Sequence, residues 1–228
     1  MDTRYGILSD IHGNLPAVNA VLDKFDSFGV NKIVCAGDIV GVGGFPEQTI
    51  DAVKSESDVC VKGNHDVIPF RSPRNDVEML EKKLFTDAVS SANQQWIKEL
   101  DPMYIEDKLQ VAHCGISASN ALGYEVGQSG IRPKDFVTVA SQVDVPLLIL
   151  GHTHEQHVIE DKFGHNTVVV NPGVVGDVYT NTAQYAIVDT DSTGNVTHVE
   201  LHTTEYDQSK LYERIREIED EYEFNYGL

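Results

Sequence analysis

Five short polar stretches in this chain carry residue types that bind metal ions, and each follows an apolar run. They are Asp10-Ile11-His12, Gly37-Asp38, Gly63-Asn64-His65-Asp66, His113 and Gly151-His152-Thr153-His154. The third is the densest, because it places an amide, an imidazole and a carboxylate at consecutive positions. A regular strand would split these side chains between two faces, whereas a turn opened by glycine can aim them into one cleft.

Together these stretches offer oxygen and nitrogen donors for divalent cations. Seven protein ligands are too many for one catalytic metal that keeps an open position, but they suit two metals that share a carboxylate such as Asp38. Mixed oxygen and nitrogen donors suit borderline divalent metals, with manganese as the default and nickel, zinc, iron, cobalt or magnesium as alternatives. The candidate ligands are Asp10, His12, Asp38, Asn64, His113, His152 and His154.

Two such metals lower the pKa of a shared water and clamp an in-line displacement at phosphorus. This chemistry predicts a hydrolase that acts on phosphoric esters, with a hydroxide that bridges the two metals as the nucleophile. His65 is the imidazole left over, and we expect it to give a proton to the leaving oxygen. Asp66 follows it directly, and we expect Asp66 to hold His65 in the required tautomer. Both residues are therefore candidate catalytic residues.

The elements that must position these stretches alternate in the first half of the chain. Residues 5–8, 32–36 and 58–62 read as strands, and the segments between them read as helices that start near Leu15 and Glu47. Val18, Leu22 and Phe25 recur at helical spacing and mark a buried face. The order is typical of parallel strands joined by right-handed crossovers. Residues 76–100 then predict two further helices.

The second half predicts mostly strands. Strand pairs are expected within 104–112, between 158–161 and 166–170, and between 184–189 and 195–202, and a single strand is expected at 145–150. A loop at 114–132 leads to a helix candidate at 133–141. Residues 205–224 predict a C-terminal helix with Leu211, Ile215, Ile218 and Tyr222 on one face. We therefore expect one α/β domain over residues 1–228, a four-layered α/β/β/α sandwich of two mixed β-sheets.

The composition argues against polyanionic partners. The chain has 36 acidic and 17 basic residues and a net charge of −19, so nucleic-acid polymers and anionic membrane surfaces would be repelled. No apolar run reaches the roughly 18 residues of a membrane helix, and no signal peptide is evident. These features favour a cytoplasmic protein, and dispersed acidity would suit a high-salt cytoplasm. Cys35 and Cys60 lie in apolar runs and are expected to be core residues.

The five stretches resemble, in the correct order, the sequence blocks of the calcineurin-like metallophosphoesterases, in particular a compact prokaryotic phosphodiesterase-like branch. The match spans most of residues 5–175, and Asn171-Pro172-Gly173 is similar to that branch as well. The resemblance implies that His65 is the catalytic histidine. It implies one metal held by Asp10, His12, Asp38 and His154, and a second held by Asp38, Asn64, His113 and His152.

The sequence thus predicts a metal-dependent phosphoesterase for small phosphodiesters or monoesters, with nucleotides among the candidate substrates, acting as a monomer or small homo-oligomer. Cys114, Val174 and Asp177 differ from the usual residues of the branch, and they touch the expected substrate rim without removing a ligand. One alternative is a catalytically silent binding or scaffold protein of the same fold. Another is a mononuclear metal hydrolase acting on C–N or C–O bonds, which would need fewer ligands around one ion.

Overall fold

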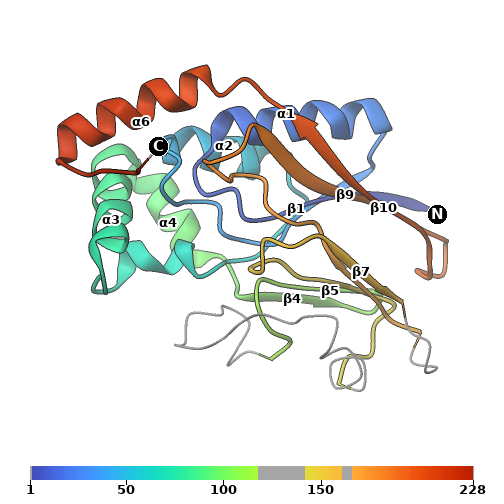
Figure 1. Cartoon of the computed structure of the whole chain (residues 1–228). Helices are drawn as coiled ribbons and strands as arrows, with labels where there is room; N and C mark the ends of the chain where they lie inside the picture. The colour runs from blue at the N-terminus through green and yellow to red at the C-terminus, as the bar shows by residue number, and fades with distance from the viewer. Residues whose placement is uncertain (1, 118–141, 161–165, 228) are drawn as a thin grey trace.

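Two five-stranded sheets face each other in the computed structural model, which describes residues 2–117, 142–160 and 166–227 (Figure 1). The first sheet has the order β10-β9-β1-β2-β3 and the second has the order β4-β5-β6-β8-β7. The first sheet consists of β1 (Thr3–Leu8), β2 (Lys32–Cys35), β3 (Val59–Cys60), β9 (Thr182–Thr190) and β10 (Val196–Glu205). The second consists of β4 (Met103–Glu106), β5 (Leu109–Ala112), β6 (Leu147–Ile149), β7 (His157–Glu160) and β8 (Val168–Asn171).

Both sheets are mixed, as predicted. In the first sheet, β1, β2 and β3 run parallel, whereas β9 pairs antiparallel with both β1 and β10. In the second sheet, β5, β6 and β8 run parallel and the edge strands β4 and β7 are antiparallel to their neighbours. Because parallel strands in one sheet end at the same edge, the loops that follow them gather there.

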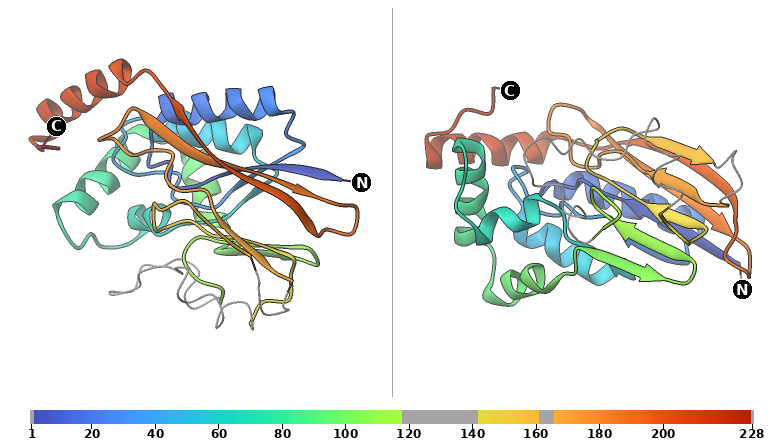
Figure 2. Two further views of the ribbon diagram at one scale, coloured as in Figure 1. Left: turned by 45° about the vertical axis from the view of Figure 1, so that its right-hand side comes forward. Right: turned by 90° about the horizontal axis from the view of Figure 1, so that it is seen from below.

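Helices flank the sheets, and Figure 2 shows α1 and α2 on the face of the first sheet that points away from the second. Helix α1 begins where Asn14 Oδ1 accepts the Ala17 amide and ends at Gly29 in the left-handed conformation. Figure 1 shows α3, α4 and α6 toward the end of the first sheet at which the parallel strands finish. The helices are α1 (Leu15–Phe28), α2 (Pro46–Glu56), the 3₁₀ helix η1 (His65–Phe70), α3 (Asp76–Ala88), α4 (Ser91–Glu99) and α6 (Ser209–Tyr222).

Apolar side chains fill the space between the two sheets and the space under the helices. Ile7 of β1 points between the sheets, where it meets Val111 and Ile149. The next residue, Leu8, points to the opposite face and packs with Phe25 of α1, as the strand period of two requires. None of the described helices has the length and apolar composition needed to cross a bilayer.

Some boundaries differ from the prediction. Strand β3 is short because the Lys62 amide leaves the sheet and donates to the Asp101 carbonyl. The turn after Gly63 continues into η1, a short 3₁₀ helix that the sequence pattern does not indicate. Strand β10 extends to Glu205, so the last helix begins only at Ser209, with Leu211, Ile215 and Ile218 buried. The predicted helix at 133–141, and nearly all of the loop before it, lie outside the described residues.

Candidate metal centre

Loops at one end of both sheets bring all seven candidate ligands together. The first sheet contributes residues that follow β1, β2 and β3, and the second contributes residues that follow β5 and β6. Five of these side chains are within hydrogen-bonding distance or ion-pair range of at least two others of the set, and Asp38 and His152 each approach one. In chain order, the seven are Asp10, His12, Asp38, Asn64, His113, His152 and His154.

The backbone is unusual at five of these positions, since all five have left-handed φ angles. Non-glycine residues rarely adopt this region, and each instance costs on the order of 1–3 kcal/mol unless the surroundings enforce it. Here the amides of Ile11 and His12 both donate to the Asp38 carbonyl, at 2.8 and 2.9 Å, and lock the first two loops together. The φ angles are 55° at Asp10, 51° at His12, 53° at Asp38, 69° at His152 and 57° at His154.

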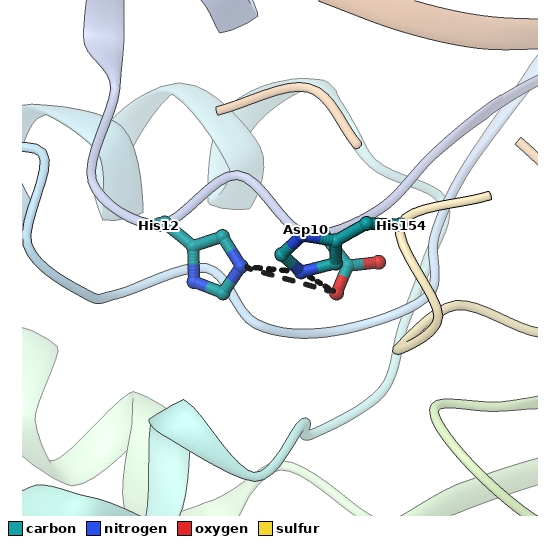
Figure 3. A group of neighbouring side chains, drawn as sticks. All are labelled: Asp10, His12 and His154. Carbon is teal, nitrogen blue, oxygen red and sulfur yellow. Dashed lines mark hydrogen bonds and ion pairs between the residues drawn. The ribbon is translucent and has the colours of Figure 1, made fainter. Parts of the chain in front are cut away.

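Asp10, His12 and His154 form the first group of donors (Figure 3). Asp10 Oδ1 lies 3.2 Å from His154 Nε2 and 3.9 Å from His12 Nε2, and the two Nε2 atoms are 3.1 Å apart. This oxygen is buried and has no hydrogen-bond partner among the described residues. A buried carboxylate oxygen left in this way is costly, so the three atoms fit a cation between them.

Asp38, Asn64, His113 and His152 form the second group. His113 Nε2 lies 3.1 Å from both Asp38 Oδ2 and Asn64 Oδ1, and His152 Nδ1 lies 2.9 Å from the same Asn64 oxygen. His113 Nδ1 is 2.8 Å from the Ala36 carbonyl, so it donates there and leaves Nε2 to serve as a ligand. A neutral His113 would then turn a lone pair toward two oxygens, an arrangement that calls for a positive charge between them.

The electrostatics of the centre also call for positive charge. Burial lowers the pKa of His113, but the carboxylates of Asp38 and Asp10 outweigh it and raise the pKa to about 10. Burial and the charge of His65 lower the pKa of His12 to about 3, which keeps this imidazole neutral, as a ligand must be. Burial raises the pKa of Asp38, but neighbouring imidazoles, His113 foremost, outweigh it and hold the pKa well below its usual range.

The donor groups overlap, because Asp10, His12 and Asp38 each belong to more than one of them. Asp10 and Asp38 form a set with His113, and Asp38 forms another with His12 and His65, each with its donor atoms within 4.8 Å of one another. Carboxylates shared between neighbouring sets are the feature expected of two-metal sites. Access from outside is on one side, because the His154 side chain is 47% exposed and the His113 side chain is fully buried.

His65 lies beside the centre, but the carboxylate that contacts it is Glu81. His65 Nδ1 is 2.9 Å from Glu81 Oε1 and 3.0 Å from Oε2. Burial lowers the pKa of His65, but the charge of Asp38 and the hydrogen bond to Glu81 outweigh it and raise the pKa to about 9. Since Nδ1 is engaged with Glu81, Nε2 is the nitrogen left to serve a substrate.

The predicted contact between Asp66 and His65 is wrong, because backbone amides occupy both Asp66 oxygens. Oδ1 accepts the amides of Ile39 and Val40, and Oδ2 accepts the amide of Gly63. Asp66 is fully buried and ties the loop after β2 to the turn after β3. A side chain at Gly63 would overlap Asp38 Oδ1, so only glycine allows these two loops to approach so closely.

Glu81 was missed because it lies in α3, outside all five polar stretches. A signal was nevertheless present in the sequence. Leu84 and Phe85, three and four residues after Glu81, are buried on the same helix face. An acidic residue on the apolar face of an amphipathic helix is unusual unless it has a polar or charged partner. Because α3 follows the Gly63 turn in the chain, His65 could be that partner.

Comparison with known proteins places the chain in a family. The calcineurin-like phosphoesterase superfamily domain matches residues 4–193, and the chain belongs to this superfamily. An uncharacterized protein of Methanocaldococcus jannaschii is 28% identical over 92% of this chain and 90% of its own. A metallophosphoesterase from Sphaerobacter thermophilus has a TM-score of 0.74 at 25% identity and covers 95% of this chain and 94% of its own. A hypothetical protein from Pyrococcus horikoshii shares the fold with a TM-score of 0.76 at 17% identity, over 93% of this chain and 92% of its own.

Proposed function

We propose that this protein is a metal-dependent phosphoesterase that hydrolyses small phosphodiesters or monoesters. The buried Asp10 Oδ1, left without a hydrogen bond among the described residues and surrounded by imidazole nitrogens, is the observation that carries the proposal. Two ions would share Asp38, the first with Asp10, His12 and His154 and the second with Asn64, His113 and His152. Carboxylate, amide and imidazole donors suit manganese, with zinc, nickel, iron, cobalt and magnesium as alternatives.

Two divalent cations bound there would lower the pKa of a water molecule toward neutrality and neutralise charge on the phosphoryl oxygens. The protein's own residues position the donors, compensate charge and donate the proton. The loop backbone fixes the donors before substrate arrives, and the buried carboxylates compensate the added positive charge. His65, whose Nδ1 is held by Glu81, gives a proton from Nε2 to the leaving oxygen as the phosphorus–oxygen bond breaks.

The substrate class follows from charge and size. A net charge of −19 repels long polyanions, which gain affinity mainly by pairing phosphates with basic side chains. A small ester presents a single phosphoryl group, and the metal ions alone can neutralise it. Nucleotides and other small phosphate esters therefore fit the site better than nucleic-acid polymers.

Hydrolysis of bis- and mono-p-nitrophenyl phosphate tests the proposal. The protein is stripped of metal and then titrated with manganese, nickel, zinc and magnesium in turn, at low and at molar salt. Metal-dependent release of nitrophenolate is expected, and the ratio of the two rates ranks diesters against monoesters. A folded protein that releases none with any metal would contradict the proposal and favour a binding role for the same fold.

A further inference from the structure

Glu81 is a buried carboxylate in an apolar setting. Its side chain is only 3% exposed, and its neighbours on the buried face of α3 include Leu84 and Phe85. Among the described residues, the hydrogen bonds of its carboxylate go to one group, Nδ1 of His65, which both oxygens approach at nearly equal distance. Burying a glutamate side chain in this position costs folding free energy unless a partner compensates its charge.

The rest of α3 explains how Glu81 is held in place. The helix begins where Asn75 Oδ1 accepts the Glu78 amide at 2.9 Å, and Arg71 forms a two-pronged ion pair with Glu78 at 2.6 and 2.7 Å. Leu80 and Leu84 are buried in the core. These contacts fix the helix by themselves, so its attachment does not require a charge at position 81.

We propose that Glu81 is a positioning residue that holds the His65 imidazole with Nδ1 protonated and Nε2 directed at the leaving oxygen of the substrate. The proposal rests on the proposed function of His65. The carboxylate acts through His65 and touches neither the substrate nor a ligand of the metal centre. The five motifs do not include it, and the geometry of α3 alone brings it to the histidine.

The step that depends on Glu81 is proton delivery. A water oxygen attacks phosphorus, a new P–O bond forms, and the bond to the leaving oxygen breaks with its electron pair going to that oxygen. His65 Nε2 donates the proton to the leaving oxygen, while Nδ1 keeps its proton and its hydrogen bond to Glu81. The attacking water loses one proton to solvent and His65 regains one from solvent, so the net reaction consumes one water.

This role predicts an effect that depends on the leaving group. Esters with a poor leaving group need the proton, whereas p-nitrophenolate leaves with little help. Glu81→Gln, which keeps the size of the side chain and removes its charge, should lower kcat for diphenyl phosphate by about 10- to 100-fold. For bis-p-nitrophenyl phosphate the loss should stay under about threefold. Metal content and KM should be unchanged, and Glu81→Asp, which restores the charge, should recover part of the loss.

Two controls separate positioning from structural support. Asp76→Asn removes an exposed charge from the same helix without touching His65, and both esters should keep their rates. In a His65→Ala background, Glu81→Gln should cause no further loss with either ester, because the two residues act as one unit. Equal losses on both esters, or a full additional loss in the His65→Ala background, would overturn the positioning role.

A readout without turnover completes the test. In protein labelled with ¹⁵N-histidine, the His65 Nδ1–H signal should be present in the unmodified chain and in the Asp76→Asn variant, and lost or strongly shifted in Glu81→Gln. An unchanged signal in Glu81→Gln would overturn the inference even if activity fell. A chain that hydrolyses neither ester with any metal would instead overturn the proposed function, so the two failures are distinguishable.

Discussion

The two sheets contribute different chemistry to the centre. The loops of the first sheet supply both carboxylates, Asp10 and Asp38, together with an amide and a single imidazole. The loops of the second sheet supply imidazoles alone, at His113, His152 and His154. Negative charge thus comes from one sheet, and neutral nitrogen donors come mainly from the other.

This division has a mechanical consequence. Apart from His12 with His154, the direct contacts across the centre pair an oxygen of one sheet with a nitrogen of the other, as in Asp38 with His113 and Asp10 with His154. An ion bound between them would link the two sheets at the end where their apolar core stops. We therefore expect metal binding to stabilise the packing of the sheets as well as to support catalysis.

Removing the carboxylate proposed to be shared, Asp38, should have the largest effect on turnover and metal content. Asp38→Ala takes away the residue proposed to serve both ions, and turnover should fall by at least about a thousandfold because several kcal/mol of transition-state stabilisation disappear with the metals. Activity and metal content are measured together. Asp107→Ala, in the turn between β4 and β5, is the matched control and should retain both. Full metal content in Asp38→Ala would contradict the bridging role.

Removing one imidazole of the second sheet should weaken metal binding, and the loss should be larger for a buried imidazole than for an exposed one. His154→Ala should weaken the binding of one ion by about 10- to 100-fold, because this side chain is half-exposed and water can take its place. His113→Ala should weaken metal binding more than His154→Ala does, since it leaves the buried oxygens of Asp10 and Asp38 facing each other. Titration of metal binding in both variants tests the order, and a larger loss for His154→Ala would contradict it.

Removing the metal should lower thermal stability. An ion present at 100 times its dissociation constant stabilises the folded state by about 2.7 kcal/mol. For a chain of this size, that predicts a fall in Tm of about 5–10 °C when the metal is chelated. The shift should persist in His65→Ala and vanish in Asp38→Ala. The same Tm with and without metal would show that the ions do not link the sheets.

The smallest predicted effect lies outside both sheets. Asn75→Ala removes the N-terminal cap of α3 and should cost about 1 kcal/mol, or about 2–4 °C in Tm. Metal content should not change, because α3 contributes no ligand. A loss of metal in this variant would show that the centre depends on the helix as well as on the loops of the two sheets.

Much of the fold was predictable because the sequence pattern is local and periodic. Apolar runs marked the parallel strands of both sheets, and Val18 and Phe25 marked the buried face of α1 at helical spacing. The candidate ligands were predictable because parallel strands end at one edge, so residues after them must converge. The strand predicted at 58–62 is longer than β3. The Lys62 amide leaves the sheet to donate to the Asp101 carbonyl, and no local sequence pattern indicates this tertiary contact.

The surroundings of His65 were not predictable in the same way. Asp66 was chosen because it is adjacent in sequence, but adjacency does not determine direction. The turn at Gly63 aims the Asp66 carboxylate at three backbone amides, whereas Glu81 reaches His65 from sixteen positions away. Such contacts depend on how a helix packs, and a single sequence carries only the indirect signal of a charge on an apolar face.

The number of metal ions bound per chain shows whether two ions share the Asp38 carboxylate. The metal-free protein is reconstituted with manganese, separated from free metal and measured by elemental analysis, beside His65→Ala and Asp38→Ala. We expect two ions per chain in the unmodified protein and in His65→Ala, and none in Asp38→Ala. One ion per chain, held equally well with and without Asp38, would contradict a centre built on a carboxylate shared between two ions.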